Sequence, residues 1–153
     1  MGVKQTAREQ YRGIVDLAQG SAIHVPQEGW IRTVRKALGM SGAQLARRLA
    51  VTRARVAQAE KAELDGGVTL KSMQMMAEAM GCRFVYAFEP PATIIENVVI
   101  AQARHKAEAI VRLAAKHMAL ENQALPEPAT QQEIARVMAD LLHDMPADFW
   151  DEP

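Results

Sequence analysis

The feature that most constrains this chain is a pair of short helices predicted on either side of a three-residue connection. Residues 42 to 49 and 53 to 61 have helical apolar spacing, and Ser41 and Thr52 stand directly before them as suitable N-caps. Only residues 50 to 52 separate the two segments. So short a connection forces the two helices into a tight corner.

The residues around this corner match its packing needs. Ala46 is small enough to lie where the helices touch, and Val51, Val56 and Ala59 are apolar anchors for the second helix. Further helical stripes flank the pair and end at glycines. They comprise Trp30, Ile31, Val34 and Leu38 before Gly39, and Leu70, Met73, Met76, Ala77 and Met80 before Gly81. The methionines are interpreted as core residues. We therefore expect a mainly α, helix-turn-helix bundle.

Positive charge is concentrated on this bundle, although the whole chain has 18 basic and 18 acidic residues. Residues 30 to 62 carry a net charge of +7, and the part from Glu89 onward is acidic. Two surfaces with different partners are one interpretation, and two solvated helical faces are the other.

In a helix-turn-helix unit the second helix of the pair enters the major groove of double-stranded DNA, while neighbouring helix ends contact phosphates. Guanidinium and amide groups suit guanine and adenine edges, and hydroxyl, amide and backbone N–H groups suit phosphates. The alternative is an ordinary helical hairpin with arginines on its wet face. The predicted base-reading residues are Arg53, Ala54, Arg55 and Gln58, and the predicted phosphate contacts are Ser41, Gln44, Arg47, Arg48 and Thr52.

Residues 83 to 88, RFVYAF, alternate as a β-strand does. A lone strand cannot satisfy its own backbone, so it must pair with another segment. We expect pairing with a second copy, which gives a homodimer on an inverted-repeat operator; residues 22 to 26 are the alternative partner.

The ends of the chain are predicted to be helical. Residues 6 to 19 form a short amphipathic helix with Tyr11 and Ile14 on its apolar side. Residues 93 to 121 form one long helix or two. A further helix covers residues 130 to 143, with Thr130 as N-cap and Glu133 at the capping-box position. Trp150 is either a docked end that covers the core or an anchor for a partner.

Several motifs carry a resemblance to known families. Leu45, Ala46, Leu49, Val51, Val56 and Glu60 match the skeleton of Xre and phage-repressor helix-turn-helix domains. The stretches GWIRTVRKALGMSGAQLARRLAVTRARVAQAEKAE, GVTLKSMQMMAEAMGCRFVYAFEP, HMALENQ and FWDEP resemble the mobile mystery protein A family over almost the whole chain. This sequence has Ala50 where the class usually has Gly, at a cost of about 1 kcal/mol if the residue is left-handed, and Gly42 where it often has Gln.

The second resemblance implies a partner. Members of that family are typically encoded beside a Fic-domain protein, in an arrangement like a toxin–antitoxin pair. Fic proteins are commonly inhibited by a helix with a Ser/Thr-x-x-x-Glu-Gly/Asn motif, and Glu121-Asn122 fits its end, with His117 at the Ser/Thr position. Glu121 could instead simply end a helix, and the Asp-rich end around Trp150 could bind the partner. The possible toxin-binding residues are Glu121, Asn122 and Trp150.

Other classes lack support in the sequence. The lone Cys82 and the spacing of the four histidines do not suit a metal site, and we expect no cofactor. No signal peptide or membrane span is indicated, so the expected location is the cytoplasm. A small enzyme of the cyanase type is the competing class, but no catalytic constellation supports it.

The expected domains are an N-terminal helix with its connector (1–27), a helix-turn-helix domain with a terminal strand (28–90) and an acidic helical region (91–153). The predicted function is that of a sequence-specific transcriptional autorepressor, as the antitoxin to a Fic-domain toxin. A protein-binding antitoxin that acts mainly by direct inhibition is the alternative.

Overall fold

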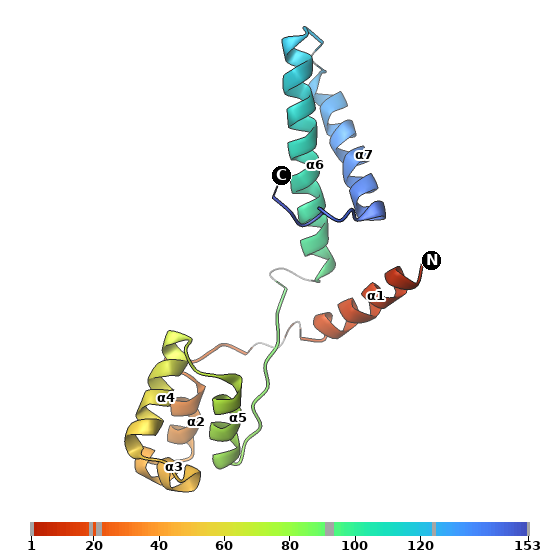
Figure 1. Cartoon of the computed structure of the whole chain (residues 1–153). Helices are drawn as coiled ribbons and strands as arrows, with labels where there is room; N and C mark the ends of the chain where they lie inside the picture. Colours follow the sequence, from red (N-terminus) through yellow and green to blue (C-terminus); the bar gives the residue numbers. More distant parts are fainter. Residues whose placement is uncertain (1, 19, 21–22, 91–93, 124, 153) are drawn as a thin grey trace. The chain divides into compact units, whose positions relative to one another are not determined.

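The computed structural model describes residues 2–18, 20, 23–90, 94–123 and 125–152. Seven helices lie within these residues, and the chain divides into two compact units (Figure 1). One unit comprises residues 21–87, and the other comprises residues 1–20 together with 88–153. None of the seven helices combines the length and apolar character that crossing a membrane requires.

The unit of residues 21–87 contains four helices, which begin and end close to where the sequence predicts. They are α2 (Trp30–Ala37), α3 (Gly42–Leu49), α4 (Arg53–Asp65) and α5 (Leu70–Ala79). Ser41, Thr52 and Thr69 cap the last three with their side-chain oxygens. Gly39, Gly66 and Gly81 follow helix ends with positive φ, which glycine adopts without steric cost.

The core of this unit is formed by the predicted apolar stripes. Every helix contributes to it, and α3 and α4 meet at the expected corner. The buried residues are Ile31, Leu45, Ala46, Val56, Met73, Met76 and Met80. Their methionines are packing residues, as predicted, whereas Val51 lies at the surface and does not anchor the corner.

The predicted strand at residues 83–88 is wrong for the single chain. These residues have no regular secondary structure, and the described residues contain no β-strand, including residues 23–26 of the alternative pairing partner. Residues 22 and 21 lie outside the described part of the chain. The physical reason is that a strand needs a neighbour to satisfy its backbone, and the helices offer no open edge.

The second unit is built on a helical hairpin. α6 (Glu96–Leu120) is one continuous helix, which decides between the two alternatives, and α7 (Glu127–Asp144) packs along it (Figure 1). Their shared core comprises Ala103, Ala107, Leu141 and Phe149. The buried side of α6 also includes Val111 and Lys106, whereas Ile110 and Ala114 are exposed.

The N-terminal helix differs from the prediction. α1 (Val3–Asp16) begins and ends earlier than expected, and the side chains of Val3, Tyr11 and Ile14 remain exposed. Its charged side chains make the contacts within the unit instead. Arg12 forms an ion pair with Glu96 at 3.2 Å, and the Asp16 carboxylate accepts a hydrogen bond from the Ile95 N–H at 2.9 Å.

Two details at the end of the chain also correct the sequence reading. α7 begins at Glu127 after Pro126, so Thr130 lies inside the helix, and Glu133 forms an ion pair with Arg136 instead of completing a capping box. The residue that covers the core is Phe149, which is 1% exposed, whereas Trp150 is 56% exposed and packs edge-on against Phe149.

Candidate nucleic-acid interface

The turn between α3 and α4 has the geometry of a helix-turn-helix corner. Ser41 and Gln44 form a capping box at the start of α3, with hydrogen bonds of 3.1 and 2.7 Å. Ala50 ends α3 in the left-handed conformation, at φ 55° and ψ 39°. Thr52 Oγ1 then accepts a hydrogen bond from the Arg55 N–H at 3.2 Å and starts α4. The corner is therefore fixed by local contacts on both sides.

The start of α4 presents the predicted base-reading residues to solvent. Arg53, Ala54, Arg55 and Gln58 are all exposed, while Val56 faces the core. Within the described part of the chain, the two guanidinium groups and the Gln58 amide form no hydrogen bond or ion pair. They are consequently free to contact another molecule.

Several other basic side chains on this unit are already engaged. Arg32 and Lys36 both form ion pairs with Glu28, at 3.5 and 2.6 Å, and Lys36 holds the pKa of the Glu28 carboxyl below its usual range. Arg48 donates a hydrogen bond from Nε to the Ala79 carbonyl at 2.6 Å. Arg48 therefore links α3 to the end of α5. The sequence predicted a phosphate contact for Arg48 and did not predict this structural one.

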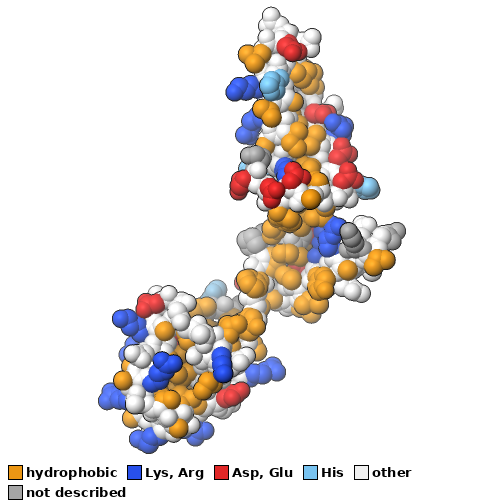
Figure 2. Space-filling view, in the orientation of Figure 1, with side chains coloured by type: hydrophobic (Ala, Val, Ile, Leu, Met, Phe, Trp, Pro, Cys, Tyr) orange, Lys and Arg blue, Asp and Glu red, His pale blue; other side chains and the backbone are white. Residues whose placement is uncertain are grey.

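Arg47 is the second-helix arginine that remains available. It is exposed and, among the described residues, has no hydrogen-bond or ion-pair partner. It lines an open hollow beside the α2–α3 turn with Gln44 and Met40. The predicted phosphate contacts Ser41, Gln44 and Thr52 are also exposed, although their side chains serve as caps. Figure 2 shows Lys and Arg distributed over the α2–α5 unit, and Asp and Glu gathered over α7 and the C-terminal segment.

Two glutamates hold the unit together. Glu60 belongs to the helix-turn-helix skeleton in the sequence, whereas no role was predicted for Glu63. Glu60 forms an ion pair with Arg35 at 2.7 Å, with both side chains largely buried, and Arg35 also donates to the Met40 carbonyl. The Glu63 carboxylate accepts hydrogen bonds from the backbone N–H groups of Trp30 and Ile31, at 2.5 and 3.0 Å. A negative charge here satisfies free donors at the α2 N-terminus.

The sequence contained a signal for the Glu63 contact. Gly29, the residue before α2, has no side chain with which to cap the helix, and its φ is 79°. A Cβ at this position would lie 2.8 Å from Glu63 Oε2. A helix start without a local cap must find an acceptor elsewhere, and α4 supplies it.

The possible toxin-binding residues lie on the other unit. Glu121 and Asn122 follow the end of α6 and are exposed, and Asn122 has a left-handed backbone, which is common at helix ends. Trp150 is exposed in the C-terminal segment. Glu121 follows the C-terminal end of α6, whereas Phe149, next to Trp150, is bound to Gln102 near the other end of this helix. No contact between described residues joins Glu121 and Trp150. Among the described residues, no cluster of His, Cys, Asp or Glu could hold a metal ion.

Comparison with known proteins gives one match. A family described as Helix-turn-helix matches residues 31–86, which span α2 to α5 and the segment after them. No curated protein and no solved structure matches the chain. Domains of this kind are typical of non-enzymatic, DNA-binding transcriptional regulators. Residues 31–86 are thus an Xre-type helix-turn-helix domain.

Proposed function

We propose that this protein binds an inverted-repeat operator in double-stranded DNA as a homodimer and represses transcription, most directly of its own promoter. The observation that carries the proposal is the distribution of free cations. Arg47, Arg53 and Arg55 have no partner in the described chain, whereas Arg32, Arg35 and Lys36 are ion-paired. These three arginines lie on α3 and at the start of α4, at the corner that a helix-turn-helix unit presents to DNA.

The roles of these residues follow from their positions. Arg53, Arg55 and Gln58 occupy the first two turns of α4, which is the part of the helix that reaches base edges. Ala54 is small enough to let the helix approach a thymine methyl group. Ser41, Gln44, Arg47 and Thr52 lie at the ends of α3 and α4, where exposed N–H groups and positive charge suit phosphates.

The test compares variants of the full chain on operator and random DNA. Gln58→Ala should cost about 1–3 kcal/mol on the operator and relax the preference at one base pair. Arg47→Ala should weaken binding to all DNA similarly and reduce the salt slope by about one. Arg32→Ala is the matched control, because Arg32 is ion-paired with Glu28, and its effect should be the smallest. Equal affinity for promoter and random DNA at physiological salt would contradict the proposal.

We further propose that the acidic unit binds a toxin of the Fic class. This proposal is supported by the resemblance to mobile mystery protein A and by the exposure of Glu121, Asn122 and Trp150. A carboxylate at the end of a long helix can form a bidentate pair with a guanidinium and compete with phosphate for it.

The measurement is the AMP-transfer activity of the Fic protein encoded beside this chain. Glu121→Gly should abolish inhibition while operator binding stays unchanged, and Glu127→Gly is the control for loss of a nearby exposed carboxylate. Equal inhibition by both variants would exclude Glu121, and no inhibition by the parent chain would exclude direct restraint. Direct inhibition without operator binding would favour the protein-binding antitoxin.

A further inference from the structure

The segment after α5 has an open backbone. Within the described part of the chain, no backbone N–H or C=O group of residues 83–89 takes part in a hydrogen bond. Gly81, with φ 74°, precedes the segment, and Pro90, which cannot donate a ladder hydrogen bond, ends it. A row of unpaired donors and acceptors is a template for another extended chain.

The side chains of this segment are apolar and largely uncovered. Val85 and Tyr86 are each 64% exposed, and Phe88 is 87% exposed. The rings of Phe84 and Tyr86 stack with their centroids 5.9 Å apart, which places these two side chains on the same face. Aromatic residues exposed in alternation are costly to leave in water and indicate a covered surface.

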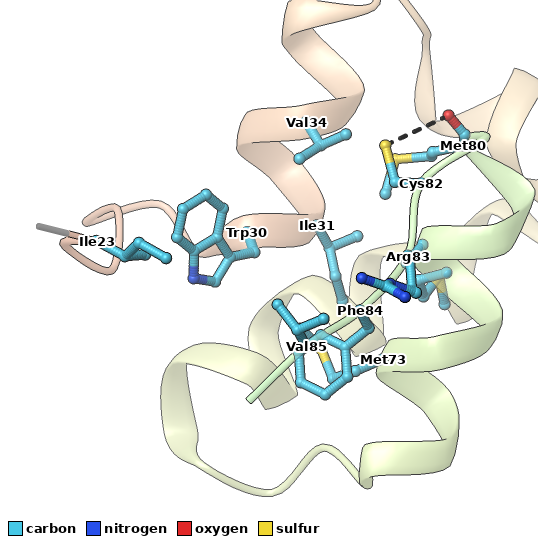
Figure 3. A pocket seen from close by; sticks show the side chains of 12 residues that line it. Ile23, Trp30, Ile31, Val34, Met73, Met80, Cys82, Arg83, Phe84 and Val85 are labelled. Carbon is cyan, nitrogen blue, oxygen red and sulfur yellow. Dashed lines mark hydrogen bonds between the residues drawn. The ribbon is translucent and has the colours of Figure 1, made fainter. Parts of the chain in front are cut away.

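An apolar pocket of about 280 Å³ lies beside the start of the segment. Figure 3 shows Trp30, Ile31 and Val34 of α2 and Met73 of α5 around the pocket that Cys82 to Val85 also line. The segment is thus one wall of an apolar hollow as well as an open edge. Whatever covers the edge must have an extended backbone and apolar side chains.

The sequence of the segment is self-complementary, which favours a second copy of the same chain as that occupant. Residues 83–89 read RFVYAFE. The residue types run in the same order from either end, charged, aromatic, aliphatic and then Tyr86, but the charge is positive at Arg83 and negative at Glu89. In an antiparallel pair about a two-fold axis at Tyr86, Arg83 lies opposite Glu89 and Phe84 lies opposite Phe88. Val85 lies opposite Ala87, and Tyr86 meets its own copy.

Charge and aromatic pairing both favour this register. Neither Arg83 nor Glu89 has an ion-pair partner in the described chain, and the register gives each one an opposite charge, twice per dimer. It also brings Phe84, Tyr86 and Phe88 of each copy onto one shared face, where aromatic cross-strand pairs stabilise a sheet.

We propose that two copies of this chain associate by antiparallel pairing of residues 83–89 about a two-fold axis at Tyr86. The segment has no strand geometry in the single chain because its partner is the second chain. The inference rests on the proposed function in that it names the surface that joins the two DNA-binding units. It can nevertheless be tested without DNA.

The first experiment is disulfide cross-linking in the full chain with Cys82→Ser, which removes the sole cysteine. Directly opposite residues of an antiparallel pair have Cα atoms about 4.5–5.5 Å apart, within the span of a disulfide. Tyr86→Cys should therefore give a covalent dimer on mild oxidation. Arg83→Cys and Glu89→Cys should give none alone, because each lies roughly 20 Å from its own copy, but should cross-link when mixed.

The second experiment uses charge reversal and sedimentation. Arg83→Glu and Glu89→Arg each place like charges opposite one another twice, so each variant alone should raise the dimer dissociation constant about tenfold or more. An equal mixture of the two variants should form heterodimers, because every pair is then complementary. The double variant should recover the parent affinity, and helical circular dichroism checks that each variant is folded.

The outcomes separate this inference from the proposed function. A parent chain that is monomeric at all concentrations, or cross-linking of Arg83→Cys alone, would overturn the pairing at Tyr86. If specific operator binding persisted in either case, only this inference would be lost. If the cross-links formed as expected but operator and random DNA bound equally, the dimer would stand and the proposed function would fail.

Discussion

At the scale of single residues, the turn between α3 and α4 depends on a strained backbone conformation at Ala50. Its left-handed backbone lets the chain turn between α3 and α4, and its N–H donates to the Arg47 carbonyl at 3.2 Å. An alanine pays a steric cost in this conformation that a glycine does not.

We predict that Ala50→Gly raises the free energy of unfolding by about 1 kcal/mol, because the strain of the left-handed conformation is removed. Ala57→Gly, an exposed position inside α4, is the matched control and should lower it by about 1 kcal/mol. Urea denaturation of the two variants measures both values. A loss of stability in Ala50→Gly would show that the turn is not strained.

At the scale of the helices, the contacts between elements come from residues far apart in the sequence. Glu63 of α4 holds the start of α2, and Arg48 of α3 holds the end of α5. In the other unit, the buried Lys106 of α6 binds the carbonyl and the carboxylate of Asp148, and Gln102 donates to the Phe149 carbonyl at 2.9 Å. Phe149 is therefore held against the core by polar contacts on either side.

Replacing Glu63 should destabilise the α2–α5 unit. In Glu63→Ala both backbone donors at the start of α2 lose their acceptor, and we expect a loss of about 1–2 kcal/mol. Glu78→Ala, an exposed glutamate of α5, should change the stability by less than about 0.5 kcal/mol. Thermal melts followed through Trp30 would measure the difference, and equal effects of the two variants would exclude the capping role.

The attachment of the C-terminal segment should weaken in acid. The hydrogen bond and the charge of Lys106 lower the pKa of the Asp148 carboxyl, so its contribution to stability is present above the ordinary pKa of aspartate. That contribution is lost as the pH falls through the lowered value, below about 4. In a Trp30→Phe background, the emission of Trp150 should change in this range. Asp148→Asn should remove the pH dependence of that signal, and its persistence would assign it to another group.

At the scale of the whole molecule, the chain has two separate cores, one in each unit. The two tryptophans are divided between them, because Trp30 belongs to the α2–α5 unit and Trp150 to the α6–α7 unit. Each unit can therefore be followed by its own fluorophore once the other is replaced by phenylalanine.

We predict that destabilising variants act on one unit at a time. Glu63→Ala should lower the midpoint of the melt reported by Trp30 and leave the one reported by Trp150, because the Glu63 contacts lie in a single core. Lys106→Ala should do the reverse, since it leaves Asp148 without its partner. Parallel shifts of both signals in either variant would show that the two units unfold as one.

The helices and the corner were predictable from the sequence, because the interactions that set them are local. Ser41 and Thr52 cap the helices that they directly precede. The spacing of apolar residues within each helix fixes which side is buried, and that side includes Ile31, Leu45, Val56 and Met73. The base-reading role of the residues at the start of α4 rests on their place in the sequence and stays a prediction. For them, the tertiary structure adds that Arg53 and Arg55 are not engaged elsewhere in the described chain.

What the sequence could not decide depends on neighbours that only folding brings together. Arg48 and Arg47 are adjacent in the sequence, yet Arg48 is bound to Ala79 and Arg47 has no partner among the described residues, because they point in different directions from α3. Phe149 and Trp150 are also adjacent in the sequence, yet the ring of Phe149 is buried and that of Trp150 is exposed. The alternation of residues 83–88 has strand character, but a strand needs a paired neighbour, and the described residues of the single chain provide none.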